Sequence, residues 1–144
     1  MIIVSACLLG VDCKYNGGNN DCPAVKEYLL GKNYFPVCPE VAGGLPAPRN
    51  PSEIFDGKVI DPEGNDLSIP FYEGAEKAWE EALRHSELYG EEITLAILKA
   101  RSPSCGSGHI YDGTFSGRRV EGNGIFARLL IEKNIKIISE EDFS

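Results

Sequence analysis

The chain has 144 residues, of which 42% are hydrophobic and 25% are charged. This size and composition fit one compact domain with an ordinary hydrophobic core, so we expect residues 1–144 to form a single domain. The formal net charge of -8 argues against general nucleic-acid binding, because phosphate backbones attract clustered Lys and Arg side chains.

The cysteines and the start of the chain predict where the protein works. The five cysteines are an odd number, and Met1 leads into a short apolar run without the basic start and long hydrophobic stretch of a signal peptide. No window approaches the roughly 18 consecutive apolar residues of a membrane span. We therefore expect a cytoplasmic protein with reduced thiols and no membrane attachment, while its oligomeric state stays open.

Short apolar runs bounded by Gly, Pro or Asn predict the strands of a sheet. We expect the first strand at residues 1–5, followed by a Gly/Asn-rich loop at 10–20. Asp21 suits the N-cap of a helix that has Pro23 in its first turn and ends at Gly31.

The middle of the chain predicts a strand, a hairpin, a long helix and another strand. Residues 34–37 form the second strand, and an Asp-Gly pair within 52–61 is typical of a β-hairpin turn. From 69 to 90 the apolar residues recur at helical spacing, with charged residues largely on the opposite side. Residues 93–98 are almost continuously apolar, which suits a central parallel strand.

The last part of the chain predicts a turn at 111–113, a helix at 124–133 and a strand at 135–138. The order of strand, helix, strand, hairpin, helix, strand, helix and strand implies a mostly parallel sheet covered on both faces. We therefore predict an α/β fold, a three-layer Rossmann-like sandwich with a small β-hairpin beside it.

Three cysteines each follow a predicted strand of the parallel sheet. They are Cys7, Cys38 and Cys105, and their turns are rich in Gly, Pro and Ser. Because the carboxyl ends of parallel strands share one edge, we expect the three thiols to meet in one cleft. Thiolates bind zinc and iron–sulfur clusters, which makes this cleft a candidate metal site. The alternative is that the three cysteines are buried in the core and bind no metal.

Polar residues beside these cysteines are candidates for catalysis and binding. Glu40 lies two residues after Cys38, where its carboxylate can act as general acid or base, or simply lie on the surface. Ser102 and Ser104 precede Cys105 and can hydrogen-bond a polar substrate or their own turn.

Four further residues have less specific surroundings. Arg49 can meet an anionic or carbonyl group, or pair with a surface carboxylate. Cys13 and Cys22 can be additional ligands, redox-active thiols or residues without a role, and His109 can be a zinc ligand or a polar surface residue. The two cysteines and His109 keep a second function open, a non-catalytic zinc-binding or thiol-based redox or regulatory module.

Three blocks of the sequence resemble a known family. They are VSACLLG at 4–10 with CKYNG at 13–17, CPEVAGGLP at 38–46 with PR at 48–49, and KARSPSCG at 99–106 with IYDG at 110–113. Together they resemble the domain family, formerly of unknown function, that includes the thiouracil desulfidases. The resemblance spans nearly the whole chain.

The resemblance implies a cofactor and a reaction. It implies a [4Fe-4S] cluster held by three cysteines, which map onto Cys7, Cys38 and Cys105, with the fourth iron open to the substrate sulfur. The implied activity is the hydrolysis, without net redox change, of a thiolated pyrimidine such as 2-thiouracil to uracil and sulfide. The open iron then acts as a Lewis acid.

The resemblance also implies roles for residues around the cluster. Glu40 matches the acid/base carboxylate, and a serine of the turn before Cys105 matches the substrate-orienting residue. We favour Ser102 for that role, with Ser104 close behind. Ser104 and Arg49 are expected to bind the substrate, a small molecule.

Overall fold

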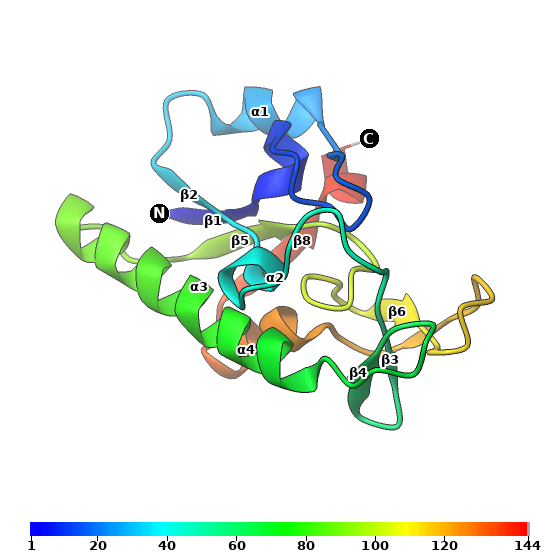
Figure 1. Cartoon of the computed structure of the whole chain (residues 1–144). Coiled ribbons are helices and arrows are strands. Elements are labelled where there is room, and N and C mark those ends of the chain that lie inside the picture. Colours follow the sequence, from blue (N-terminus) through cyan, green and yellow to red (C-terminus); the bar gives the residue numbers. More distant parts are fainter. Residues whose placement is uncertain (144) are drawn as a thin grey trace.

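Four strands form a parallel sheet in this computed structural model, which describes residues 1–143 (Figure 1). Their order across the sheet is β2 (Tyr34–Val37), β1 (Ile2–Ser5), β5 (Leu95–Leu98) and β8 (Lys136–Ser139). Every pairing is parallel, and Ile3 lies between Phe35 on one side and Ala96 on the other. The predicted α/β class with its mostly parallel sheet is confirmed.

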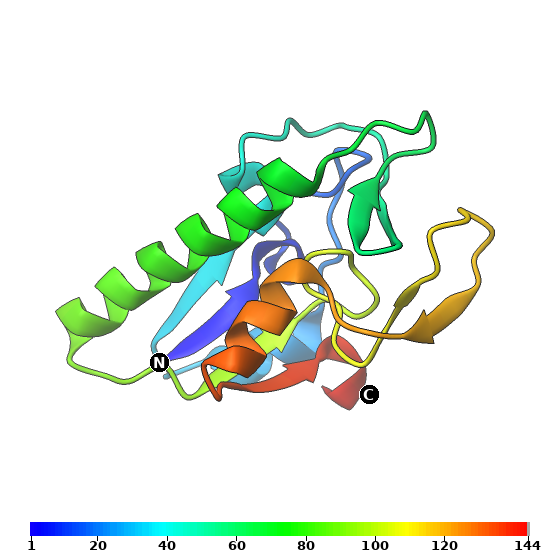
Figure 2. The ribbon, with the colours of Figure 1, turned by 90° about the horizontal axis from the view of Figure 1, so that it is seen from below.

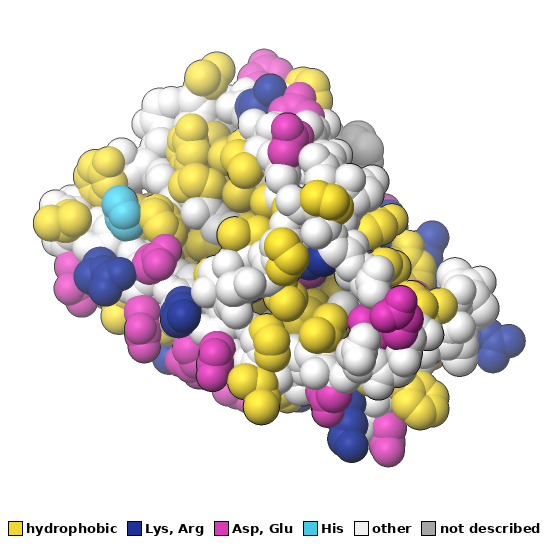
Figure 3. Space-filling view, viewed as in Figure 1, with side chains coloured by type: hydrophobic (Ala, Val, Ile, Leu, Met, Phe, Trp, Pro, Cys, Tyr) yellow, Lys and Arg dark blue, Asp and Glu magenta, His cyan; other side chains and the backbone are white. Residues whose placement is uncertain are grey.

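Two helices cover the face of the sheet to which Ile3 and Leu98 contribute. They are α3 (Ser68–Tyr89) and α4 (Ile125–Glu132), and the fully buried Phe126 belongs to the same core cluster. Figure 3 shows acidic and basic side chains over the outward side of α3, as the helical spacing predicts. None of the helices within residues 1–143 is both long and apolar enough to cross a membrane.

The opposite face of the sheet packs against the N-terminal helix. Val4 and Ile97 belong to this second core cluster, because neighbouring residues of a strand point to opposite faces. The helix α1 (Pro23–Leu29) lies over it, together with two 3-10 helices, η1 (Ala6–Leu9) and η2 (Glu140–Phe143). Figure 1 shows α1 on one side of the sheet and α3 and α4 on the other, the three layers that we predicted.

Two small hairpins lie beyond the carboxyl ends of the parallel strands (Figure 2). The first, formed by β3 (Glu53–Phe55) and β4 (Lys58–Ile60), is the predicted Asp-Gly hairpin. The second is formed by β6 (His109–Tyr111) and β7 (Arg119–Glu121), where we expected only a turn at 111–113. All three residues of β7 are exposed, so this strand lacks the apolar run by which a strand is predicted.

Two local predictions differ from the structure near the first two helices. Cys22, not Asp21, is the N-cap of α1, because the Asp21 carboxylate pairs instead with the Lys26 ammonium at 2.9 Å. The segment after Cys38, predicted as a turn, begins with a one-turn helix, α2 (Pro39–Ala42). Pro at the first position of this helix suits its fixed backbone angle.

Two glycines allow α2 to lie directly against α3. A Cβ on Gly74 would overlap the carbonyl oxygen of Pro39, and one on Gly43 would overlap that of Pro70. Only glycine leaves room for such an approach of two backbones. This contact fixes the position of the segment that carries Glu40.

Candidate functional site

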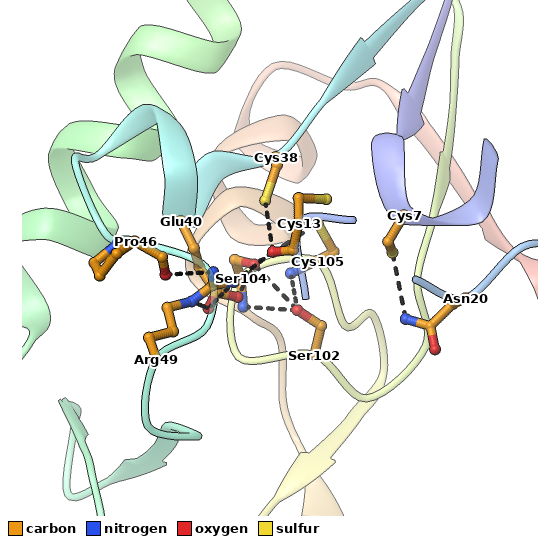
Figure 4. A network of polar contacts seen from close by, with 10 residues as sticks. All are labelled: Cys7, Cys13, Asn20, Cys38, Glu40, Pro46, Arg49, Ser102, Ser104 and Cys105. Carbon is orange, nitrogen blue, oxygen red and sulfur yellow. Dashed lines mark hydrogen bonds and ion pairs between the residues drawn. The ribbon is translucent and has the colours of Figure 1, made fainter. Parts of the chain in front are cut away.

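A pocket of about 630 Å³ opens at the carboxyl edge of the parallel sheet. This edge is where open α/β sheets place their ligand sites. Segments from several distant parts of the chain contribute to its wall, and both hairpins reach it through Glu53 and Tyr111. Its sulfur-bearing and principal polar residues, which Figure 4 shows together, are Cys7, Cys13, Cys38, Glu40, Arg49, Ser102, Ser104 and Cys105.

The structure brings the three expected cysteines into this pocket. Cys7 lies in η1 directly after β1, Cys38 follows β2, and Cys105 follows the turn after β5. Cys13 is a fourth thiol of the same pocket, although its Gly/Asn-rich loop made it a weaker candidate in the sequence. No pattern in the sequence shows that this loop folds back over the strand ends.

Cys13 and Cys38 form a hydrogen-bonded pair. The Cys38 Sγ lies 3.8 Å from the carbonyl oxygen of Cys13, and the Cys13 thiol also hydrogen-bonds to the Cys38 sulfur. Donation by Cys13 lowers the pKa of the Cys38 thiol to about 7 and raises the pKa of the Cys13 thiol. Cys38 is therefore the thiol that most readily becomes a thiolate.

Burial has the opposite effect on the other two thiols. It raises the pKa of Cys105 to about 12, and it also raises the pKa of Cys7. The Asn20 side-chain amide donates a hydrogen bond to the Cys7 Sγ at 3.4 Å, which favours the thiolate. Both thiols must lose a proton before they bind a metal, so their deprotonation is linked to metal binding.

The chemistry of the donor atoms in this pocket suits an iron–sulfur cluster. Cys7, Cys38 and Cys105 line one pocket, and the charges on these three thiols affect one another. Thiolates are the usual ligands of iron–sulfur clusters. Within residues 1–143, no group of three His, Cys, Asp or Glu side chains is placed to hold a single metal ion.

Two residues of the alternative zinc hypothesis lie away from this pocket. Cys22 packs against the core cluster under α1, and His109 is exposed on β6. Neither residue lines the pocket wall. The structure therefore does not bring Cys22 or His109 together with the other thiols.

A chain of hydrogen bonds connects the expected catalytic residues. The Ser104 Oγ donates to the Glu40 Oε2 at 3.0 Å, and the Ser102 Oγ lies 3.0 Å from the Ser104 Oγ. Ser104, rather than Ser102, is thus in direct contact with the carboxylate. The Cys105 Sγ lies 3.8 Å from the same Ser104 hydroxyl, so carboxylate, hydroxyl and thiol are neighbours.

The turn that carries both serines is held by its own polar groups and by α4. The Ser102 Oγ accepts hydrogen bonds from the backbone N–H groups of Ser104 and Cys105, at 3.2 and 3.0 Å. The backbone carbonyls of Pro103 and Ser104 accept the first free N–H groups of α4. A rigid helix therefore positions this side of the pocket.

Arg49 lies in the pocket wall, but most of its guanidinium faces protein groups. It forms an ion pair with Glu40, with 3.0 Å between Nη2 and Oε1, and the two side chains are only 8% and 14% exposed. It also donates to the backbone carbonyls of Pro46 and Cys13. The expected contact of Arg49 with a substrate stays a prediction.

The fold and the pocket together define the class of this protein. It is a Rossmann-like α/β protein whose parallel sheet presents thiols, a largely buried carboxylate and two hydroxyls in one pocket at its carboxyl edge. Such a combination of thiols and acid–base groups in one pocket is typical of an enzyme active site.

Comparison with known proteins identifies the family. The model of the 2-thiouracil desulfurase family matches residues 2–142, so the chain belongs to this family. A protein of Bacillus subtilis (strain 168), the uncharacterized protein YbbK, is 37% identical over 156 residues, which cover 100% of this chain and 98% of that protein.

A solved structure supports the same assignment. It is that of the [4Fe-4S]-dependent thiouracil desulfidase TudS, which is 40% identical and has a TM-score of 0.83. The match covers 98% of this chain and 91% of that chain. Family, fold and sequence similarity thus support a desulfidase activity.

Proposed function

We propose that this chain is an iron–sulfur-dependent desulfidase, which hydrolyses a thiolated pyrimidine such as 2-thiouracil to uracil and sulfide without net redox change. Family membership and the similarity to TudS support the proposal. The observation in this chain that carries it is the hydrogen-bonded series of Ser102, Ser104 and Glu40 in the same pocket as the thiols.

Cys7, Cys38 and Cys105 are the proposed ligands of a [4Fe-4S] cluster. Each of them follows a strand of the central sheet, so a rigid element positions each sulfur atom. When bound, the cluster supplies an iron without a protein ligand, a Lewis acid for the thiocarbonyl sulfur. Cys13 lies outside this ligand set and supports Cys38 through their hydrogen bond.

Glu40 is the proposed general base and acid. Its Oε1 is occupied by Arg49, whereas its Oε2 accepts from Ser104. The carboxylate takes a proton from the water that adds to the ring carbon and returns a proton to the departing sulfur. Ser104 orients the ring and connects it to Glu40, and Ser102 holds the Ser104 hydroxyl in place.

Residues 1–144 carry every part of this proposed site, and we assign them to one catalytic domain. The described cysteines are free thiols, which is usual in the reducing cytoplasm, where we place the activity. The substrate is a small molecule, because the net charge of -8 disfavours nucleic acids.

Anaerobic reconstitution followed by incubation with 2-thiouracil tests the activity. We expect uracil and sulfide in equal amounts, measured by chromatography and by a colorimetric sulfide assay. A protein with full iron and acid-labile sulfide content that releases neither product contradicts the proposed substrate. Stoichiometric zinc in protein purified under nitrogen contradicts the proposed cofactor and supports the zinc-binding alternative.

Single cysteine variants test the ligand set. Cys7→Ser, Cys38→Ser and Cys105→Ser are each expected to lose the cluster, because a hydroxyl is a poor iron ligand. Cys22→Ser is the matched control and is expected to keep full iron and sulfide content, since Cys22 lies under α1. A ligand variant with undiminished iron and sulfide content removes that residue from the set.

A further inference from the structure

Arg49 connects two segments of the pocket wall that are far apart in the sequence. Its Nη2 donates to the carbonyl oxygen of Cys13 at 2.9 Å, while its Nε donates to the Glu40 Oε1 at 3.1 Å. Its backbone N–H also donates to the carbonyl oxygen of Tyr15 at 2.6 Å. One residue thus fastens the loop of Cys13 to the segment that carries Glu40.

The number of donors on Arg49 limits what else it can bind. A guanidinium has five N–H groups in a planar fork. Nε and Nη1 each use one, on Glu40 and Pro46, and Nη2 reaches both Cys13 and Glu40. These contacts leave one N–H for any other partner, and the side chain is 8% exposed.

The carbonyl oxygen of Cys13 is contacted by both Arg49 and Cys38. It accepts from Arg49 and lies 3.8 Å from the Cys38 Sγ. The Arg49 contact with this oxygen is the shorter of the two, at 2.9 Å, and it comes from a charged donor. Arg49 is therefore the main side chain that holds the Cys13 carbonyl in place.

We propose that Arg49 is a positioning residue, which fastens the loop of residues 10–20 over the pocket and orients Glu40, and that it is not a substrate-binding residue. This inference rests on the proposed function only for the roles of Glu40 and the thiols. The fastening of the loop is a property of the chain itself. It can be measured without substrate.

Hydrogen exchange of the full-length protein, measured by mass spectrometry in Arg49→Met and Arg49→Lys, tests the proposal. In Arg49→Met we expect exchange in peptides of residues 10–20 to be faster by about tenfold or more, because a largely buried ion pair and two carbonyl contacts are lost. Peptides of α3 should exchange as in the wild type. Arg49→Lys should lie between the two, since an ammonium cannot span the same acceptors.

The kinetics of the reconstituted variants supply a second readout. A positioning role predicts a lower iron content or a lower kcat, with the KM for 2-thiouracil within about twofold of the wild type. Arg84→Gln, on the exposed side of α3, is the matched control and should change neither readout. Without desulfidase activity in any variant, the exchange data still decide the role of Arg49.

Three outcomes overturn the inference. The first is unchanged exchange at residues 10–20 in both variants. The second is equal acceleration across all peptides in both variants, which shows a loss of general stability. The third is a large rise in KM with unchanged exchange and kcat, which shows that Arg49 binds the substrate after all.

Discussion

The direction of the hydrogen bonds around Glu40 follows from the number of protons on the serines. A Ser hydroxyl has one proton, and that of Ser104 goes to the Glu40 carboxylate, since a charged acceptor binds it best. The Ser104 oxygen is then left to accept, so Ser102 is its donor at 3.0 Å. The three groups therefore form a series in which protons point toward Glu40.

Replacement of the carboxylate should stop turnover and leave the cofactor in place. In Glu40→Gln the amide is similar in size, but it cannot take a proton from water, so we expect kcat to fall by about 10²- to 10⁴-fold. Iron and sulfide content should match the wild type, because Glu40 is not a proposed ligand. Undiminished turnover in Glu40→Gln, measured as uracil release, would remove Glu40 from the chemistry.

At the scale of the elements, the close contact of α2 with α3 predicts that Gly74→Ala destabilises the protein, whereas helix propensity alone predicts the opposite. Ala in place of a mid-helix Gly stabilises a helix by about 1 kcal/mol. In Gly74→Ala, however, the new methyl overlaps the carbonyl of Pro39. We expect the free energy of unfolding to fall by about 1–3 kcal/mol. We also expect the reconstituted variant to bind less iron, because α2 directly follows the proposed ligand Cys38.

Urea unfolding and iron analysis check this forecast for α2. Glu76→Ala, on the exposed side of the same helix, is the control and should retain both stability and iron content. A Gly74→Ala protein that is more stable than the wild type would show that α2 can move aside without cost.

Asp61, in the loop after β4, should make the stability of the protein depend on pH in the acidic range. Asp61 is buried and accepts hydrogen bonds from Asn65, Glu63 and Asn50. These hydrogen bonds lower the pKa of the Asp61 carboxyl below the ordinary 3.8, and those from Asn65 have the largest effect. Its contribution is therefore complete above pH 3.8 and is lost as the pH falls through the lower folded value. Asp61→Asn, which has no charge to lose, removes this contribution at neutral pH.

Thermal unfolding of the two proteins at several pH values measures the effect. The wild type should melt at the higher temperature near neutral pH, and the difference should shrink below pH 3.8. A difference that stays constant down to the lowest pH would show that the Asp61 charge does not matter.

The elements that could be predicted from the sequence are those with an apolar period. The strand at 34–37 and the helix at 69–90 each bury one side, whereas the strand at 93–98 buries both faces. In each case burial leaves a recognisable pattern of apolar residues. The exposed strand β7 and the one-turn helix α2 bury too little to leave such a pattern.

The convergence of the thiols was predicted for the same reason, because three of them follow buried strands. The place of Cys13 could not be predicted in this way. Its loop is positioned by Arg49 and by Asn20, whose backbone N–H donates to the carbonyl of Cys7. Contacts of single side chains between distant loops leave no period in the sequence.

At the scale of the whole molecule, residues near the end of the chain support the turn between β5 and Ser102, which forms one side of the pocket. Glu140, directly after β8, accepts from the backbone N–H of Ala100 and pairs with Lys99, both at 2.8 Å. The turn that leads from β5 to Ser102 thus depends on residues placed last in the sequence. Lys99 also donates its backbone N–H to the Ser5 hydroxyl at 2.9 Å, which connects this turn to β1.

Loss of this carboxylate should loosen the turn without unfolding the protein. We expect Glu140→Gln to lower the free energy of unfolding by about 1 kcal/mol, since the pair with Lys99 is only partly buried. The reconstituted variant should lose iron faster in the presence of a chelator. Glu132, exposed on α4, gives the control variant Glu132→Gln, which should lose iron at the wild-type rate. Equal rates of iron loss in the wild type and both variants would show that Glu140 does not support the pocket.

The order of the strands across the sheet also has a consequence for biosynthesis. The β5 strand, which leads to Cys105, lies between β1 and β8, so the thiols meet only after nearly the whole chain has left the ribosome and folded. The first 40 residues, with Cys7, Cys13 and Cys38, cannot complete the site on their own. We therefore expect the proposed cluster to be delivered late in maturation, to a folded protein with an open pocket.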